Sequence, residues 1–150
     1  MNAIFDVIPR TVTKFDDDSF WKVLEERHPQ ERTRRAAKAR FYWQRSLPSL
    51  GLVVTLYVSP DKDRCGVFVG RNEKLGAIEV VERLQPHAAR LCEILKLDPA
   101  VSSAEFPFMS EWQVNCFAPD NWPAMTDWLT TEASRFERAL VAILAHEDRQ

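Results

Sequence analysis

The stretch FYWQRSLPSLGLVVTLYVSPDKDRCGVFVGR, residues 41–71, determines the fold class of this chain. Three segments rich in β-branched and aromatic side chains lie at residues 40–47, 52–58 and 65–70, and the first of them begins one residue before this stretch. Two short segments with Pro, Ser and Asp separate them, and these residues are typical of turns. Because β-branched and aromatic residues favour strands, the stretch predicts an antiparallel meander of three strands.

Helical patterns flank this meander on both sides. Residues 19–28 follow three aspartates that can cap a helix start, and the helix should end before Pro29. Residues 75–97 carry apolar side chains at helical spacing, and Pro86 should kink or split that helix. A last long helix is expected to begin near Pro123, because proline is well tolerated in a first turn.

Two further strands are predicted between the last two helices, AEFPFM at residues 104–109 and EWQVNCFA at residues 111–118. The order is then α-β-β-β-α-β-β-α. We expect an α+β fold with one antiparallel sheet of about five strands and helices packed on one face. Residues 1–150 should form a single domain, of which 1–15 are an extended arm; for residues 29–39, helix, loop and disorder all stay open.

Composition describes an ordinary globular domain. Of the 150 residues, 45% are apolar and 28% charged, and the formal net charge is −2, so the whole molecule is not a polycation. No run approaches the roughly 18 apolar residues of a membrane span, and the N-terminus lacks a signal-peptide pattern. Three widely spaced cysteines suit reduced, buried thiols. We therefore expect a cytoplasmic protein without a membrane partner.

Two stretches resemble a known family. The meander at 41–71 and DNWPAMTDWLTTEASRFERAL at 120–140 resemble a bacterial domain-of-unknown-function family, and Phe20-Trp21 also fits its pattern. Members are often fused to, or encoded beside, restriction-endonuclease-like and defence-associated proteins. The resemblance extends over roughly residues 19–144. It implies an accessory or recognition role in the bacterial cytoplasm and brings no catalytic residues.

Motifs for catalysis, metals and phosphate are missing from the sequence. His28, His87 and His146 lie in different elements without a second ligand at zinc spacing. No lysine has an acid two positions before it, as restriction-type nucleases require, and no Gly-x-Ser-x-Gly or Gly-rich phosphate motif occurs. We predict no cofactor and favour a non-enzyme, while a site assembled only by folding stays open.

A basic stretch is the main functional signal. Between Arg27 and Arg45 seven basic residues occur with one acid, Glu31, and aromatic residues follow. Basic side chains can bind the phosphate backbone of a nucleic acid, while exposed aromatic rings beside them stack on its nucleobases. The same basic side chains can instead bind an acidic protein segment. A solvated charged face beside core aromatics is the third interpretation. The candidate binding residues are Arg32, Arg34, Arg35, Lys38, Arg40, Tyr42 and Trp43, and Arg64 and Arg71 can extend them.

Two function hypotheses follow. The first is a non-enzymatic recognition or accessory domain of a bacterial cytoplasmic system, with nucleic acid or a protein as its partner and a link to defence. The second is a dimeric, chaperone-like module that displays an apolar sheet face to a client. Trp112 and Phe117 should point to opposite faces of one strand, and this favours a cover from a partner or a homodimer.

Overall fold

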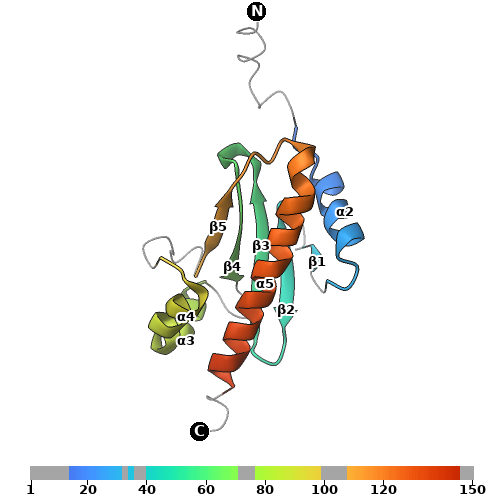
Figure 1. The fold of residues 1–150 in the computed structure, drawn as a ribbon. Coiled ribbons are helices and arrows are strands. Elements are labelled where there is room, and N and C mark those ends of the chain that lie inside the picture. The colour runs from blue at the N-terminus through green and yellow to red at the C-terminus, as the bar shows by residue number, and fades with distance from the viewer. Residues whose placement is uncertain (1–13, 32–33, 36–39, 71–76, 99–107, 146–150) are drawn as a thin grey trace, which may run out of the picture.

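The computed structural model describes residues 14–31, 34–35, 40–70, 77–98 and 108–145, without the side chains of Arg34, Arg35 and Ala77. It is an α+β fold with one antiparallel sheet, as predicted, and the five strands of this sheet lie in the order β1-β2-β3-β4-β5. Helices α2 and α5 lie side by side across one face of this sheet, and α3 and α4 lie at one end of it (Figure 1). The strands are β1 Arg34–Arg35, β2 Tyr42–Leu47, β3 Leu52–Ser59, β4 Arg64–Gly70 and β5 Ser110–Gln113.

Each helix begins or ends where the sequence places a cap or a proline. Helix α2 (Asp17–Arg27) begins after Asp16, whose carboxylate accepts the backbone N–H of Ser19 at 3.1 Å. The central helix divides at Pro86 into α3 (Ala77–Leu84), the 3-10 turn η2 (Gln85–His87) and α4 (Ala88–Leu95). Helix α5 (Trp122–Leu144) carries a proline in its first turn. The split and the start of the last helix are confirmed predictions.

The core lies between the sheet and helices α2 and α5. Alternate residues of β3 are at most 1% exposed there, namely Leu52, Val54 and Leu56. Val67 of β4 and Phe136 of α5 are 0% exposed and belong to the same cluster. Because a strand presents every second side chain to one face, this alternation is what attaches the helices to the sheet.

The other face of the central strands is also buried. Val53, Thr55 and Tyr57 of β3 and Phe68 of β4 alternate with the core residues, yet each is at most 8% exposed. Strands that are covered on both faces have nearly continuous apolar sequences, which explains the unbroken run LVVTLYV. The central part of this second face is therefore not an exposed apolar surface.

The fourth and fifth predicted strands need correction. Residues 104–107 lie outside the described residues, and Phe108 has a left-handed backbone, φ 52°, so the predicted strand does not include it. Strand β5 ends at Gln113, and the chain then turns where the side chain of Asn115 accepts the N–H of Phe117 at 3.0 Å. The fifth strand of the sheet is instead β1, from the stretch whose conformation the sequence left open.

Most of the predicted N-terminal arm, residues 1–13, lies outside the described residues. Phe15, at its end, is buried against the rings of Phe20 and Trp122, with centroid distances of 5.6 and 5.7 Å. Among the described helices, none has the length and apolar character needed to cross a membrane.

Candidate functional site

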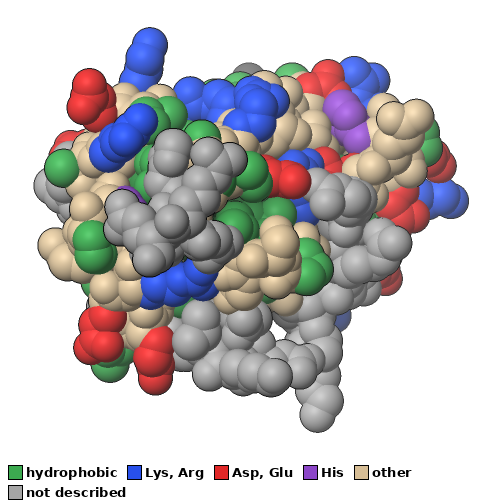
Figure 2. Space-filling view, turned by 90° about the horizontal axis from the view of Figure 1, so that it is seen from below, with side chains coloured by type: hydrophobic (Ala, Val, Ile, Leu, Met, Phe, Trp, Pro, Cys, Tyr) green, Lys and Arg blue, Asp and Glu red, His purple; other side chains and the backbone are tan. Residues whose placement is uncertain are grey.

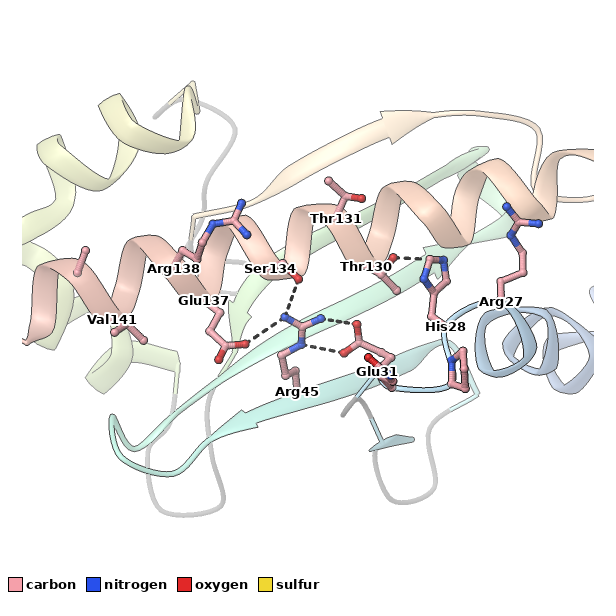
Figure 3. Close-up of a pocket in the computed structure, with 13 residues that line it drawn as sticks. Arg27, His28, Glu31, Arg45, Thr130, Thr131, Ser134, Glu137, Arg138 and Val141 are labelled. Carbon is pink, nitrogen blue, oxygen red and sulfur yellow. Dashed lines mark hydrogen bonds and ion pairs between the residues drawn. The ribbon is translucent and has the colours of Figure 1, made fainter.

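Two hollows among the described residues are lined by both acidic and basic side chains. The larger, here called the α5 groove, has a volume of about 1120 Å³ and runs between α5, the end of α2 and strand β2 (Figure 3). Its lining includes Arg27, His28, Glu31, Arg45 and Glu137. Whether these groups can bind a ligand depends on the partners they already have.

The centre of the α5 groove is an ion-pair network around Arg45. The Arg45 side chain is 5% exposed and donates from Nε to Glu31 Oε2 at 2.8 Å, with a second bond from Nη2 to Glu31 Oε1. Its Nη1 donates to Ser134 Oγ at 3.2 Å and to Glu137 Oε1 at 3.1 Å. Figure 3 shows this guanidinium lying between the two carboxylates. These bonds are all internal, so Arg45 joins β2 and the loop after α2 to α5 and is not a ligand-binding group.

His28 and Thr130, in the same groove, do not form a catalytic pair. Nε2 of His28 lies 2.6 Å from Asp127 Oδ1 and 3.5 Å from Thr130 Oγ1, so both partners approach one ring nitrogen. The Thr130 hydroxyl donates to the Thr126 carbonyl at 3.0 Å. In a catalytic triad, the nucleophile bonds one ring nitrogen of the histidine and an orienting carboxylate bonds the other nitrogen. Here the hydroxyl and the carboxylate lie at the same nitrogen, so the geometry is not that of a triad.

The second hollow, here called the Tyr42–Glu111 cavity, has a volume of about 410 Å³. It lies at the end of the sheet where β2 and β4 begin and β3 ends, beside the 3-10 turn η1 (Pro60–Lys62). The strand register places Tyr42 opposite Tyr57, Tyr57 opposite Gly66 and Gly66 opposite Glu111, so one row crosses four strands. The described residues that line it are Phe41, Tyr42, Tyr57, Val58, Ser59, Pro60, Asp61, Lys62, Arg64, Met109 and Glu111.

A hydrogen-bonded row forms one wall of this cavity. The Tyr57 hydroxyl donates to Glu111 Oε2 at 2.8 Å, and Arg64 Nη1 donates to the same oxygen at 3.2 Å. Burial, followed by the hydrogen bond to the Glu111 carboxylate, raises the pKa of Tyr57 far above its ordinary value of 10.0. The phenol therefore stays protonated and serves as a donor. Gly66 makes room for this ring, since a Cβ there would lie 2.5 Å from the Tyr57 hydroxyl.

Several polar groups at the cavity have unused bonding capacity. Within the described part of the chain, the Lys62 ammonium, the Asp61 carboxylate and the Tyr42 hydroxyl make no hydrogen bond or ion pair. Arg64 uses only Nη1, and its side chain is 41% exposed. The cavity thus combines an exposed ring with charged groups of both signs that are free to bind a ligand.

The structure brings together only part of the predicted binding surface. Tyr42 is 37% exposed and lines the cavity, and Arg64 lines it too. Arg40 lies next to the cavity residue Phe41, with its guanidinium 5.2 Å from that ring, but it also forms an ion pair with Asp17 at 3.0 Å.

Other predicted residues are unavailable or undescribed. Trp43 is 6% exposed and stacks on Trp21 at 4.9 Å in the core, so the prediction that its ring contacts a ligand is wrong. Strand β1 contains Arg34 and Arg35, whose side chains are not described, and their backbones pair with Gln44 and Trp43. Three predicted residues lie outside the described residues: Arg32, Lys38 and Arg71.

Sequence reasoning missed Tyr57, Glu111 and Lys62 as site residues, and Lys62 lies in the turn predicted between the strands at 52–58 and 65–70. The meander pattern contained a signal for Tyr57, because pairing β2 with β3 through a short turn places it opposite Tyr42. No comparable signal identified Glu111, which reaches the cavity through the pairing of β5 with β4.

The structure offers no metal-binding cluster in its described residues, where no group of three or more His, Cys, Asp or Glu side chains is suitably placed. Cys65 and Cys116 are both 0% exposed, and burial raises the pKa of the Cys65 thiol well above its ordinary value of 9.0. Such thiols are poor nucleophiles. Comparisons of the chain with protein-family models, with curated proteins and with solved structures give no match.

Proposed function

We propose that this chain is a non-enzymatic recognition domain that binds single-stranded nucleic acid at the rim of the Tyr42–Glu111 cavity. The observation that supports this proposal is the exposed Tyr42 ring beside a cavity that Lys62 and Arg64 also line. A ring next to cations is the combination that binds stacked bases and a phosphate backbone together.

Each group has a distinct role in this proposal. Stacking of one base on an aromatic side chain contributes about 1–3 kcal/mol, and Tyr42 offers such a ring. Lys62, without an ion pair among the described residues, neutralises a phosphate. In the sequence, the basic residues Arg32, Arg34, Arg35 and Lys38 precede Tyr42 closely and add further positive charge.

A single strand fits these features better than a duplex. Stacking requires a base whose face is exposed, and bases in a duplex are covered by their neighbours. The candidate ring lies at the edge of a concave hollow, whereas duplex recognition usually presents a helix or a ribbon to a groove. The bacterial cytoplasmic and defence-related context that the family resemblance implies is part of the same proposal.

The chaperone-like alternative has less support. It needs an exposed apolar sheet face, but Val53, Tyr57 and Phe68 are at most 8% exposed on the second face. Among the described residues, the exposed large hydrophobic side chains are Tyr42, Ile78, Ile94 and Val141, and of these Tyr42 alone lies in the sheet. Figure 2, which views the end with α3 and α4, shows acidic and basic side chains interspersed with small apolar areas.

The test is a titration of labelled oligothymidylate of about 12 nucleotides, followed by fluorescence anisotropy at about 50 and 200 mM salt. We expect salt-sensitive binding that weakens about tenfold in Tyr42→Ala and in Lys62→Glu. Arg90→Glu is the matched control, because Arg90 is an exposed basic residue on α4, at the opposite end of the sheet from η1 (Figure 1). Equal losses in Arg90→Glu and Lys62→Glu, or no binding by the unaltered chain, would refute the proposal.

A further inference from the structure

We infer that the Tyr42–Glu111 cavity holds one unstacked base and selects guanine, an inference that rests on the proposed function. Its volume of about 410 Å³ lies within the range of about 300–1,000 Å³ that is common for small-ligand sites. Single-stranded nucleic acids are recognised through bases that leave the stack and present their hydrogen-bonding edges to side chains.

The cavity provides faces for a flat ring. The Tyr42 and Tyr57 rings lie on neighbouring strands with centroids 6.4 Å apart and an interplanar angle of 36°. Tyr57 is 7% exposed and fixed by its bond to Glu111, whereas Tyr42 is exposed at the rim. A base can stack on Tyr42 while Tyr57 closes the cavity beneath it.

Glu111 is placed to read the edge of that base. Its Oε2 accepts from Tyr57 and Arg64, while Oε1 has a single long contact, 3.3 Å from Arg64 Nη1. No other partner of Glu111 exists in the described part of the chain. An ionised carboxylate has about four lone-pair sites, so this one keeps acceptor capacity on Oε1.

Guanine is the base whose edge complements these groups. It presents two adjacent donors, N1–H and the N2 amino group, next to the acceptor O6. The Glu111 carboxylate can accept from the two donors, and the unused N–H groups of Arg64 can donate to O6. Adenine and cytosine place an acceptor where guanine has N1–H, and thymine flanks its one donor with two carbonyl oxygens, which a carboxylate repels.

Four oligothymidylates that differ only at one central position, G, A, C or T, test this inference with the unaltered protein. We expect the guanine strand to bind about fivefold to 150-fold more tightly than the other three. Inosine at the same position lacks the N2 amino group and should lose about tenfold, whereas 7-deazaguanine keeps the whole edge and should bind like guanine.

Glu111→Gln provides the matched variant. Its affinity for the guanine strand, divided by its affinity for the thymine strand, should fall to about one, because the amide places an N–H donor against one of the two guanine donors. Equal affinity for all four strands would overturn the guanine inference and leave the proposed function standing. If the unaltered protein bound none of the four strands, both the guanine inference and the proposed function would be overturned. The two failures are therefore distinguishable.

Discussion

Replacing Arg45 with methionine should strongly destabilise this protein. Arg45 is 5% exposed, and its partners Glu31 and Glu137 are 6% and 24% exposed at their side chains. Methionine fills much of the same space but removes the guanidinium that the Glu31 and Glu137 carboxylates share. Breaking a buried ion pair by removing one partner costs about 3–5 kcal/mol. For a domain of this size, that loss lowers Tm by about 6–20 °C.

Arg27→Met is the matched control for this measurement. Arg27 also forms an ion pair with an acid, Asp127 at 2.7 Å, but the two side chains are 45% and 44% exposed. Exposed pairs contribute about 0–1 kcal/mol, so Arg27→Met should leave the free energy of unfolding nearly unchanged. The same substitution thus removes one arginine from a buried network and one from an exposed pair.

The free energy of unfolding would be measured by urea titration, with circular dichroism and tryptophan fluorescence as independent probes. A double variant, Arg45→Met with Glu31→Leu, should recover part of the loss, because it also removes one of the buried carboxylates that Arg45 bonds. A loss below about 1 kcal/mol in Arg45→Met, similar to that of Arg27→Met, would show that the network around Arg45 does not hold α5 to β2 as we infer.

Two further predictions concern the cavity wall and the response to acid. Gly66→Ala should destabilise the fold by about 1–3 kcal/mol in urea titration, because the new Cβ would lie 2.5–2.6 Å from the Tyr57 ring and hydroxyl. In a Tyr57→Ala background the same change should have little effect, and an undiminished loss there would exclude the ring as its cause. The hydrogen bond from Arg27 holds the pKa of Asp127 below its ordinary value of 3.8. The ionised Asp127 therefore stabilises the fold above pH 3.8, and this stabilisation is lost as the pH falls through the lower pKa of the folded state. Asp127→Asn should therefore weaken the fall in Tm below about pH 4, and an unchanged acid slope would contradict this assignment.

The meander and the helix boundaries could be predicted because local chemistry determines them. Aromatic residues in β2 and β-branched residues in β3 and β4 specify these strands, while Asp16 and the prolines specify where helices begin, end and divide. Strand β5 is shorter than predicted because the Asn115 turn ends the pairing, although apolar and polar residues alternate beyond Gln113. Strand β1 has only two residues, and its place in the sheet comes from pairing with β2 and not from its own composition.

The site was harder to predict because it depends on contacts between distant segments. Tyr42 was among the predicted binding residues. Glu111 lies 54 positions after Tyr57 in the sequence, and only the pairing of β5 with β4 brings its carboxylate to the Tyr57 hydroxyl. The prediction for Trp43 is wrong because alternation along β2 sends its ring to the core and that of its neighbour Tyr42 to the opposite face. Sequence periodicity indicates that two neighbours diverge, but the packing of α2 decides which of them is covered.

The basic stretch shows why local charge in a sequence is weak evidence for a charged surface. The three arginines of this stretch whose side chains are described all form ion pairs with acidic residues: Arg27 with Asp127, Arg40 with Asp17, and Arg45 with Glu31 and Glu137. Three of these four acids lie outside the stretch, so folding supplies the neutralising charge that the sequence window lacks. The cation without an acidic partner among the described residues of this cavity is instead Lys62, in the connection between β3 and β4. Ligand binding should therefore depend on the cavity, where ring, cation and carboxylate meet, more than on the number of arginines before it.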